Sequence, residues 1–308
     1  MERKKYELTG ETIKYKGYTL HRIKALKDIV INTEITIKKG NLGGWIEKEY
    51  NLSQDGNCWV SGKAKVFGDA TVKGCAYVSD YVEVHGNAII RDNSKVYGYA
   101  DVYGHSWIGD KSEIFGNAAV HGEAFVNGYA KVYGYADVYG HSWIGDKSEV
   151  YCDTKIYGNA QIYDETVICG KCCVYGNALV YGNAQIHGNA LVCGDAKVYE
   201  NAEVYGNAII REHAEIHGTA CLKEGTFQGT FNTSETNVLK ETKHFTVEVF
   251  KINSDLSREK IMTIYINTDI NDIDYLSFLI KQKHKLDNIP VSLKFTEEYN
   301  CYEDFMKQ

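Results

Sequence analysis

Aliphatic residues recur at every sixth position through the middle of the chain, from Val60 to Leu222. All 28 of these positions hold Val, Ile or Leu. The position four residues after each aliphatic one is small, because 18 of 27 are Ala, five are Ser and two are Thr. Two residues after each aliphatic one, 19 of 27 are Gly, and most of the others are Asp or Glu. The chain therefore repeats one six-residue unit without interruption.

This unit predicts a short strand followed by a sharp corner. Side chains of a strand alternate between its two faces, so the small and aliphatic residues share the inner face and the variable residues point outward. Gly tolerates the backbone angles that a tight corner needs. A corner every six residues leaves strands too short for a flat sheet. The pattern therefore predicts a parallel solenoid whose turns stack on one another.

A duplicated segment within the repeat gives information on how many sides each turn of the solenoid has. Residues 95–113 and 131–149 are identical, with an offset of 36. This offset equals two turns of a three-sided coil with 18 residues per turn, although 36 is also divisible by 12. The pattern resembles the left-handed β-helix of hexapeptide-repeat proteins, over more than half of the chain. That resemblance implies three sides, and it implies a left hand against the usual preference for right-handed crossovers.

We therefore expect a mainly β fold, with a three-sided left-handed parallel β-helix of about nine turns over residues 58–222. Residues 1–57 contain short alternating segments and predict an N-terminal β cap. Residues 223–243 begin with a stretch rich in Gly, Thr and Ser and predict a linker. Residues 244–308 predict a small α+β domain. Its predicted elements are strands at His244–Ile252, Ile261–Asn267 and Val291–Phe295 and a helix at Asp274–Lys285.

Stacking the outward residues by 18 positions predicts a surface of aromatic side chains. One column contains Ile89, Trp107, Phe125 and Trp143, and the neighbouring small residues are expected to leave these rings uncovered. A contiguous aromatic strip is typical of an interface, and Trp and Tyr are enriched in binding hot spots. The simpler alternative is that the rings only stack and stabilise the sheet. The preceding strand and the shared corner add Tyr103, His121, Tyr139, Tyr157, His105 and His141.

Three functions follow from these observations. The first is a non-enzymatic scaffold that self-associates or holds a protein partner through the aromatic strip. The second rests on the resemblance, because hexapeptide-repeat enzymes are acyltransferases, but their sites use loops that leave the coil and this frame has none. The third is a phage-encoded inhibitor of a bacterial defence protein. It rests on segments 39–47 and 51–60, which resemble the start of the solenoid in poorly characterised proteins from bacteria and their phages.

We expect no catalytic residue, metal or cofactor. The histidines of the repeat occupy outward or corner positions and form no convincing catalytic set with the acids near them. Cys169 and Cys172 are spaced like zinc ligands, but the frame points Cys172 inward and Cys169 outward. A packed core thiol is therefore the favoured interpretation of Cys172.

Charge and composition indicate which classes of binding partner and which cellular compartment to expect. The chain has a net charge of −7, and residues 58–222 carry 12 Lys and Arg against 19 Asp and Glu. An acidic solenoid is a poor nucleic-acid binder. No apolar stretch of about 18 residues predicts a membrane span, and the basic start has no apolar segment behind it. The nine cysteines suggest no disulfide framework, so we expect the reducing cytoplasm of a bacterial cell.

Overall fold

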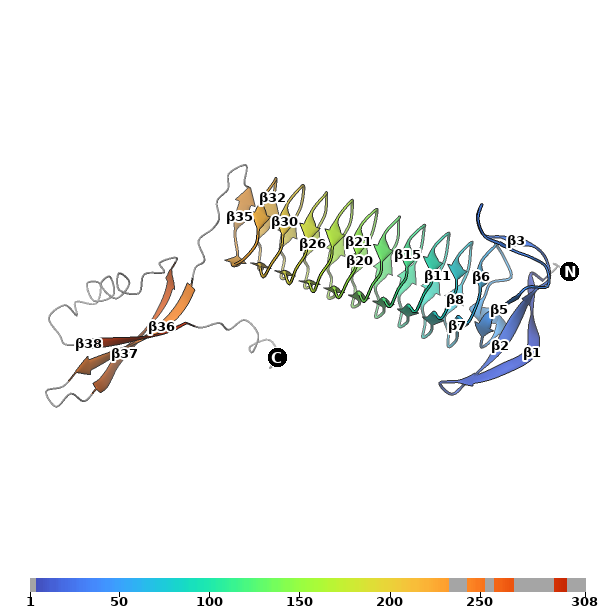
Figure 1. The fold of residues 1–308 in the computed structure, drawn as a ribbon, viewed down its shortest axis with the longest axis horizontal. Helices are drawn as coiled ribbons and strands as arrows, with labels where there is room; N and C mark the ends of the chain where they lie inside the picture. The colour runs from blue at the N-terminus through green and yellow to red at the C-terminus, as the bar shows by residue number, and fades with distance from the viewer. Residues whose placement is uncertain (1–3, 233–242, 253–257, 269–290, 298–308) are drawn as a thin grey trace. The chain divides into compact units, whose positions relative to one another are not determined.

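The computed structural model of the chain describes residues 4–232, 243–252, 258–268 and 291–297. It divides into two compact units, Met1–Asn237 and Val238–Gln308. The first unit contains a parallel β-solenoid of about 10 turns (Figure 1). The prediction of a three-sided coil is confirmed, because the solenoid strands form three parallel sheets.

Each sheet is one face of the solenoid, and we name each face by one distinguishing feature. The face that also carries an N-terminal hairpin is the hairpin face, with strands β5 (Leu42–Ile46), β7 (Lys65–Val66), β10 (Glu83–Val84), β13 (Asp101–Val102), β16 (Ala119–Val120), β19 (Asp137–Val138), β22 (Lys155–Ile156), β25 (Cys173–Val174), β28 (Leu191–Val192), β31 (Ile209–Ile210) and β34 (Thr226–Phe227).

The second sheet is the tryptophan face. Its strands are β8 (Thr71–Val72), β11 (Ile89–Ile90), β14 (Trp107–Ile108), β17 (Phe125–Val126), β20 (Trp143–Ile144), β23 (Gln161–Ile162), β26 (Leu179–Val180), β29 (Lys197–Val198), β32 (Glu215–His217) and β35 (Thr230–Asn232). The third sheet is the charged face. Its strands are β6 (Trp59–Val60), β9 (Tyr77–Val78), β12 (Lys95–Val96), β15 (Glu113–Ile114), β18 (Lys131–Val132), β21 (Glu149–Val150), β24 (Val167–Ile168), β27 (Gln185–Ile186), β30 (Glu203–Val204) and β33 (Cys221–Leu222).

The register follows the sequence repeat through most of the solenoid. Lys65 pairs with Glu83, and Glu83 pairs with Asp101, so each turn advances by 18 residues. The solenoid continues past Leu222, where a linker was expected, because β34 and β35 pair in parallel with β31 and β32. The six-residue frame slips here, and buried Phe227 takes the place of the next aliphatic residue. The change of period hid this last part of the solenoid from the sequence pattern.

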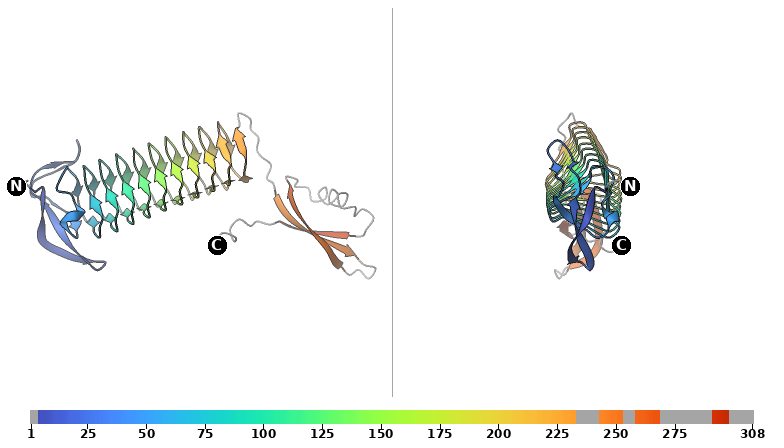
Figure 2. Two further views of the ribbon diagram at one scale, coloured as in Figure 1. Left: turned by 180° about the vertical axis from the view of Figure 1, so that it is seen from behind. Right: turned by 90° about the vertical axis from the view of Figure 1, so that its right-hand side faces the viewer.

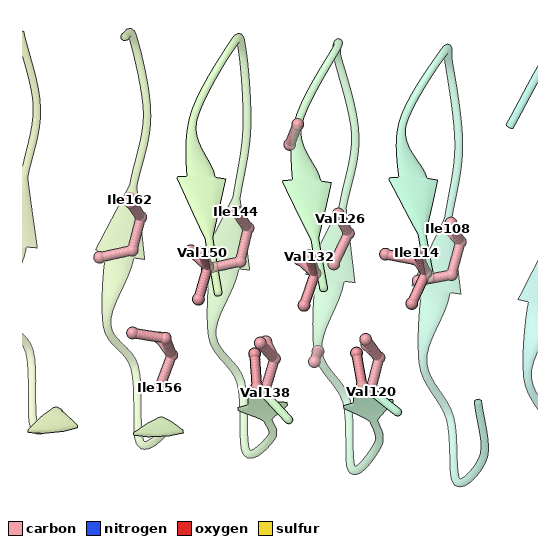
Figure 3. Close-up of a cluster of buried hydrophobic side chains, with 14 of the residues drawn as sticks. Ile108, Ile114, Val120, Val126, Val132, Val138, Ile144, Val150, Ile156 and Ile162 are labelled. Atoms are coloured by element: carbon pink, nitrogen blue, oxygen red, sulfur yellow. The ribbon is translucent and has the colours of Figure 1, made fainter. Parts of the chain in front are cut away.

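The inner wall consists of the repeated aliphatic and small side chains. Figure 3 shows aliphatic residues from successive strands, such as Ile108, Val120 and Ile144, pointing into the solenoid interior. These side chains are fully buried, as are the small residues two positions before them, which are Ser106, Ala118 and Ser142. Several inward hydroxyls bond within their own corner: Ser112 donates to the carbonyl of Gly109 and Ser148 to that of Gly145, each at 2.7 Å. The apolar wall therefore holds some hydroxyls through a backbone acceptor, whereas the buried hydroxyls of Ser106 and Ser142 have no hydrogen-bond partner.

The corners use the left-handed backbone region in every repeat. Each glycine two residues after a repeated aliphatic has a positive φ, for example +73° at Gly140. Non-glycine residues at this slot adopt the same conformation, although L side chains rarely do so. These residues are Asp80, Asp92, Asp110, Asp146, Cys152, Asp164, Glu200 and Glu212.

Acidic residues fit these corners because their carboxylates meet a backbone amide one turn later. Asp92 Oδ2 accepts a hydrogen bond from the amide of Asp110 at 3.2 Å, and Asp110 Oδ2 accepts one from Gly128 at 3.1 Å. Asn and Asp tolerate the left-handed region better than other side chains, and here the hydrogen bond offsets the remaining strain. The same contact recurs at Asp80, Asp146, Asp164 and Glu200.

The N-terminal β cap has the form of an antiparallel hairpin. Strands β1 (Tyr6–Tyr15) and β2 (Tyr18–Ala25) pair with each other, and β2 pairs antiparallel with β5, so the hairpin extends the hairpin face (Figure 2). The ring of Tyr18 lies 5.0 Å from that of Phe67, which is almost completely buried. The remaining elements of this region are β3 (Ile29–Val30), β4 (Thr36–Ile37) and the 3-10 helix η1 (Glu49–Asn51).

In the second unit the structure describes one antiparallel sheet. Its strands, in the order β37-β36-β38, are β36 (Lys243–Ile252), β37 (Arg258–Thr268) and β38 (Val291–Glu297). These correspond to the three strands predicted in this region. The predicted helix at 274–285 lies outside the described residues.

Candidate binding surface

The predicted aromatic column lies on four neighbouring strands of the tryptophan face. Ile89 pairs with Trp107, Trp107 with Phe125, and Phe125 with Trp143. The rings do not form a regular stack. The centroids of Trp107 and Phe125 are 3.8 Å apart with a tilt of 35°, whereas Phe125 and Trp143 meet edge to face at 5.6 Å and 74°. Trp143 is 48% exposed, and the other three residues are half-buried.

The neighbouring outward column explains this uneven exposure. Its residues beside the rings are Gly109, Asn127 and Gly145, which are small or polar. The indole N–H of Trp143 donates to Asn127 Oδ1 at 2.9 Å, so one edge of this ring is fixed while much of the rest faces solvent.

Trp107 differs from the expectation that its ring would be uncovered. The guanidinium of Arg91 lies 5.0 Å from the centroid of the Trp107 ring, in a cation–π contact. Arg91 is also held by Asp92, with its Nε 2.8 Å from Oδ2. Arg91 occupies the outward slot after an aliphatic residue one turn earlier, so the 18-residue register could have revealed this contact. Trp143 is therefore the most exposed ring of the column.

The aromatic residues of the hairpin face behave differently. Tyr103, His121, Tyr139 and Tyr157 lie one turn apart, with centroid separations of 4.5 to 5.0 Å and interplanar angles of 2 to 5°. We call this stack the ring ladder. Each internal ring covers the faces of its neighbours, so the members are half-buried. Three further rings extend the ladder at its ends: Phe67, His85 and Tyr175.

Carboxylates beside the ring ladder pair with its histidines and affect its tyrosines. His121 Nε2 lies 3.0 Å from Asp137 Oδ1, and His85 Nε2 lies 3.2 Å from Asp101 Oδ1. Burial raises the pKa of Tyr139, and the negative charge of Asp137 raises it further. The ladder is thus bordered by acids that favour a protonated, uncharged phenol.

The two histidines at the corner between these faces have different partners. His105 Nε2 lies 3.3 Å from Asn87 Nδ2, whereas His141 Nδ1 lies 3.1 Å from Glu123 Oε2. Both histidines are exposed. The structure therefore places all ten predicted residues on two adjoining faces and their common corner, with the ladder internally packed and Trp143 open to solvent.

The structure also reveals exposed rings that the strand columns did not include. Tyr81, Tyr99 and Tyr135 lie on the corner between the charged and hairpin faces and are 44%, 62% and 67% exposed. We call them the tyrosine edge. Tyr81 and Tyr99 stack at 4.8 Å. Each follows the residue in the left-handed corner slot, and this position in the repeat was the signal that could have identified them.

The cysteine pair does not meet as a metal site. Cys172 is buried, and its thiol lies 2.9 Å from the carbonyl oxygen of Cys169, whose side chain is half-buried. Burial raises the pKa of Cys172 to about 12, which disfavours the thiolate that zinc needs. Within the described residues, no group of three or more His, Cys, Asp or Glu side chains could hold a metal ion. The helical residues that the structure describes include no segment long and apolar enough to span a membrane.

Comparison with known proteins supports a β-solenoid repeat protein. Residues 174–188 match the YdcK β-solenoid repeat family. This short match lies within the observed solenoid, from β25 to β27. A search of curated proteins finds no match to the chain.

Proposed function

We propose that this chain is a non-enzymatic scaffold that binds a protein through the aromatic column of the tryptophan face. The contact region would be Phe125 and Trp143 with the adjoining corner at His141, and a second copy of the chain is the partner to test first. The left hand of the coil is also a proposal, because it rests on the resemblance to hexapeptide-repeat proteins.

The observation that carries this proposal is the exposure of Trp143. A large apolar ring that is 48% exposed, and fixed by a hydrogen bond to Asn127, offers area to a partner at little cost in side-chain entropy. The uninterrupted strands argue against the acyltransferase alternative. A strand begins at every sixth residue from Trp59 to Cys221, so no loop leaves the coil in this region to enclose a substrate.

Light scattering of the full chain tests self-association. Trp107→Ala combined with Trp143→Ala is expected to weaken the oligomer by about 30-fold or more in dissociation constant, since a hot-spot residue contributes about 2 kcal/mol or more. The matched control is Tyr99→Ala combined with Tyr135→Ala, because this pair also lies 36 residues apart in the duplicated segments and is exposed.

A larger loss of association in the control than in the tryptophan variant would assign binding to the tyrosine edge and contradict the proposal. If the wild-type chain is monomeric, affinity capture from a bacterial lysate with the same variants decides whether a heterologous protein binds this surface. Capture of a defence protein would support the phage-inhibitor hypothesis. No captured protein from a monomeric chain would refute the scaffold proposal.

A further inference from the structure

Lys5 and Cys58 form an unusual buried pair at the start of the solenoid. Both residues are fully buried, with exposed fractions of 0%. Lys5 Nζ lies 3.2 Å from Cys58 Sγ, although the two residues are 53 positions apart. Lys5 immediately precedes β1, and Cys58 immediately precedes β6. The contact therefore joins the N-terminal hairpin to the first turn of the charged face.

The amino group is held in place by backbone oxygens. Lys5 Nζ donates to the carbonyl of Cys58 at 2.9 Å and lies 3.4 Å from the carbonyls of Asp55 and Gly56. The neighbouring Tyr6 hydroxyl donates to the carbonyl of Leu52 at 2.7 Å. These contacts restrict the position of the amine, so its nitrogen remains close to the sulfur.

Burial favours the uncharged forms of both groups. Desolvation lowers the pKa of Lys5, while the charge of Cys58 and its hydrogen bond act in the opposite direction. Desolvation likewise raises the pKa of Cys58, against the effect of Lys5. A neutral amine has the lone pair that an electrophilic sulfur would accept. The pair thus has proximity, fixed geometry and a nucleophilic nitrogen.

We propose that Lys5 and Cys58 are a site of peroxide-driven covalent cross-linking that fastens the hairpin to the solenoid. In the first step, Lys5 Nζ takes the proton of the Cys58 thiol across their 3.2 Å contact, and the thiolate attacks hydrogen peroxide. The O–O bond breaks, and the departing hydroxide takes the proton back from Lys5, which leaves Cys58 sulfenic acid, a neutral amine and one water. Lys5 Nζ then attacks the sulfur, the S–O bond breaks, and the departing hydroxide takes a proton from the amine to form a second water.

The product of these two steps is an S–N bond between the side chains, and the protein has lost two hydrogen atoms. A second molecule of peroxide would place one oxygen atom between nitrogen and sulfur and release a further water. Either product closes a loop between residues 5 and 58. Such a loop restricts the unfolded chain, so the cross-linked protein should unfold at a higher temperature.

Mass spectrometry of the full chain after treatment with hydrogen peroxide tests the proposal. Tryptic cleavage after Lys5 should be lost, and peptide 5–14 should be recovered joined to peptide 49–63, in which Cys58 is the only cysteine. The joined mass should be the sum of the two peptides less two hydrogens, or that value plus one oxygen. Dithiothreitol should restore the separate peptides and the original unfolding temperature.

Lys5→Met and Cys58→Ser should each abolish the joined peptide, whereas Cys75→Ser should retain it. Cys172 is an internal control, because it is equally buried but its thiol faces the carbonyl of Cys169. If Lys5→Met fails to fold, the joined peptide and its reversal in the wild-type chain still decide the question. Recovery of Cys58 as a free thiol, a sulfinic acid or a disulfide with Cys75 would overturn the proposal.

Discussion

The two aromatic columns beside the His105 corner have the same register but different structures. On the hairpin face, Tyr139 stacks between His121 and Tyr157 with planes 5° and 3° from parallel. On the tryptophan face, Phe125 contacts Trp107 and Trp143 at 35° and 74°. Rings of similar size stack face to face when each turn supplies one. On the tryptophan face, where indole and phenyl rings alternate beside small residues, the rings meet at a tilt and Trp143 remains exposed.

This difference separates stabilisation from recognition. Rings in the ladder cover one another, so their contacts are made within the chain and contribute to folding. Trp143 has one fixed edge and an open surface, so its unused area is available to a partner. Of these two aromatic columns, only the one whose rings fail to stack is therefore a binding candidate.

Substitutions of the glycines beside the two columns should show the largest difference in the free energy of unfolding. A Cβ at Gly140 would lie 2.8 Å from the backbone nitrogen and oxygen of Gly158, and its φ is +73°. Gly140→Val should therefore lower the free energy of unfolding by about 3 kcal/mol or more. At Gly145 a Cβ would meet side-chain atoms of Asn127 and Trp143 at 3.1 Å, and these can move.

Gly145→Ala should accordingly cost less than about 1 kcal/mol. Chemical denaturation of both variants measures the contrast. Equal losses would show that the corner conformation does not control stability near the ladder.

Removal of one ring from each column should give the next largest difference, in both the free energy of unfolding and self-association. Tyr139→Ala breaks two stacked contacts and should lower the free energy of unfolding by about 1–3 kcal/mol, beyond the loss of buried area. Trp143→Ala should cost less in stability and more in association. Denaturant midpoints and light scattering on the same two variants provide the test. A larger stability loss for Trp143→Ala would contradict the division of roles.

Alkaline pH tests a stacked tyrosine on the charged face, Tyr133, whose ring lies 4.6 Å from that of Phe115 and 4.7 Å from that of Tyr151. Burial, together with the negative charge of Glu149 and the hydrogen bond that Tyr133 donates to Glu149 Oε2 at 3.3 Å, raises the pKa of Tyr133 to about 12. Because the folded pKa lies above the unfolded value of about 10, the phenol's contribution is complete below about pH 10 and is lost as the pH rises towards 12.

Denaturation of the wild type and Tyr133→Phe over this range measures the contribution, since phenylalanine keeps the ring and cannot ionise. The stability of the wild type should fall more steeply than that of the variant. Parallel curves would refute the assignment.

Removal of an outward ion pair from the charged face should cause the smallest loss in the free energy of unfolding. Lys131 Nζ lies 2.8 Å from Glu149 Oε1, and Lys95 Nζ lies 3.0 Å from Glu113 Oε1. Lys131→Met should lower the free energy of unfolding by about 0.2–1 kcal/mol, because exposed pairs are screened by solvent. Added salt should reduce the difference from the wild type. A salt-independent loss above this range would contradict the assignment of this contact as a screened surface ion pair, because methionine retains most of the apolar side chain of Lys131.

Much of the solenoid could be predicted from the sequence because its period is local and regular. The aliphatic residues from Val60 to Leu222 identified the inner wall, and an 18-residue step identified which outward residues become neighbours. The end of the solenoid was missed because the spacing changes before Phe227. The sequence showed that acids replace glycine at corners such as Asp92, but it did not show why, since the stabilising amide comes from the next turn.

The sequence alone determined the repeat and the inward and outward alternation. With the three sides that the resemblance implies, it also gave the membership of each column as far as Leu222, because neighbouring turns there differ by 18 residues. Only the tertiary structure decided how the side chains in a column meet. The position of Arg91 over Trp107 and the parallel stack around Tyr139 depend on contacts across turns. The meeting of Lys5 with Cys58 depends on how the hairpin returns to the solenoid, and no local period encodes that path.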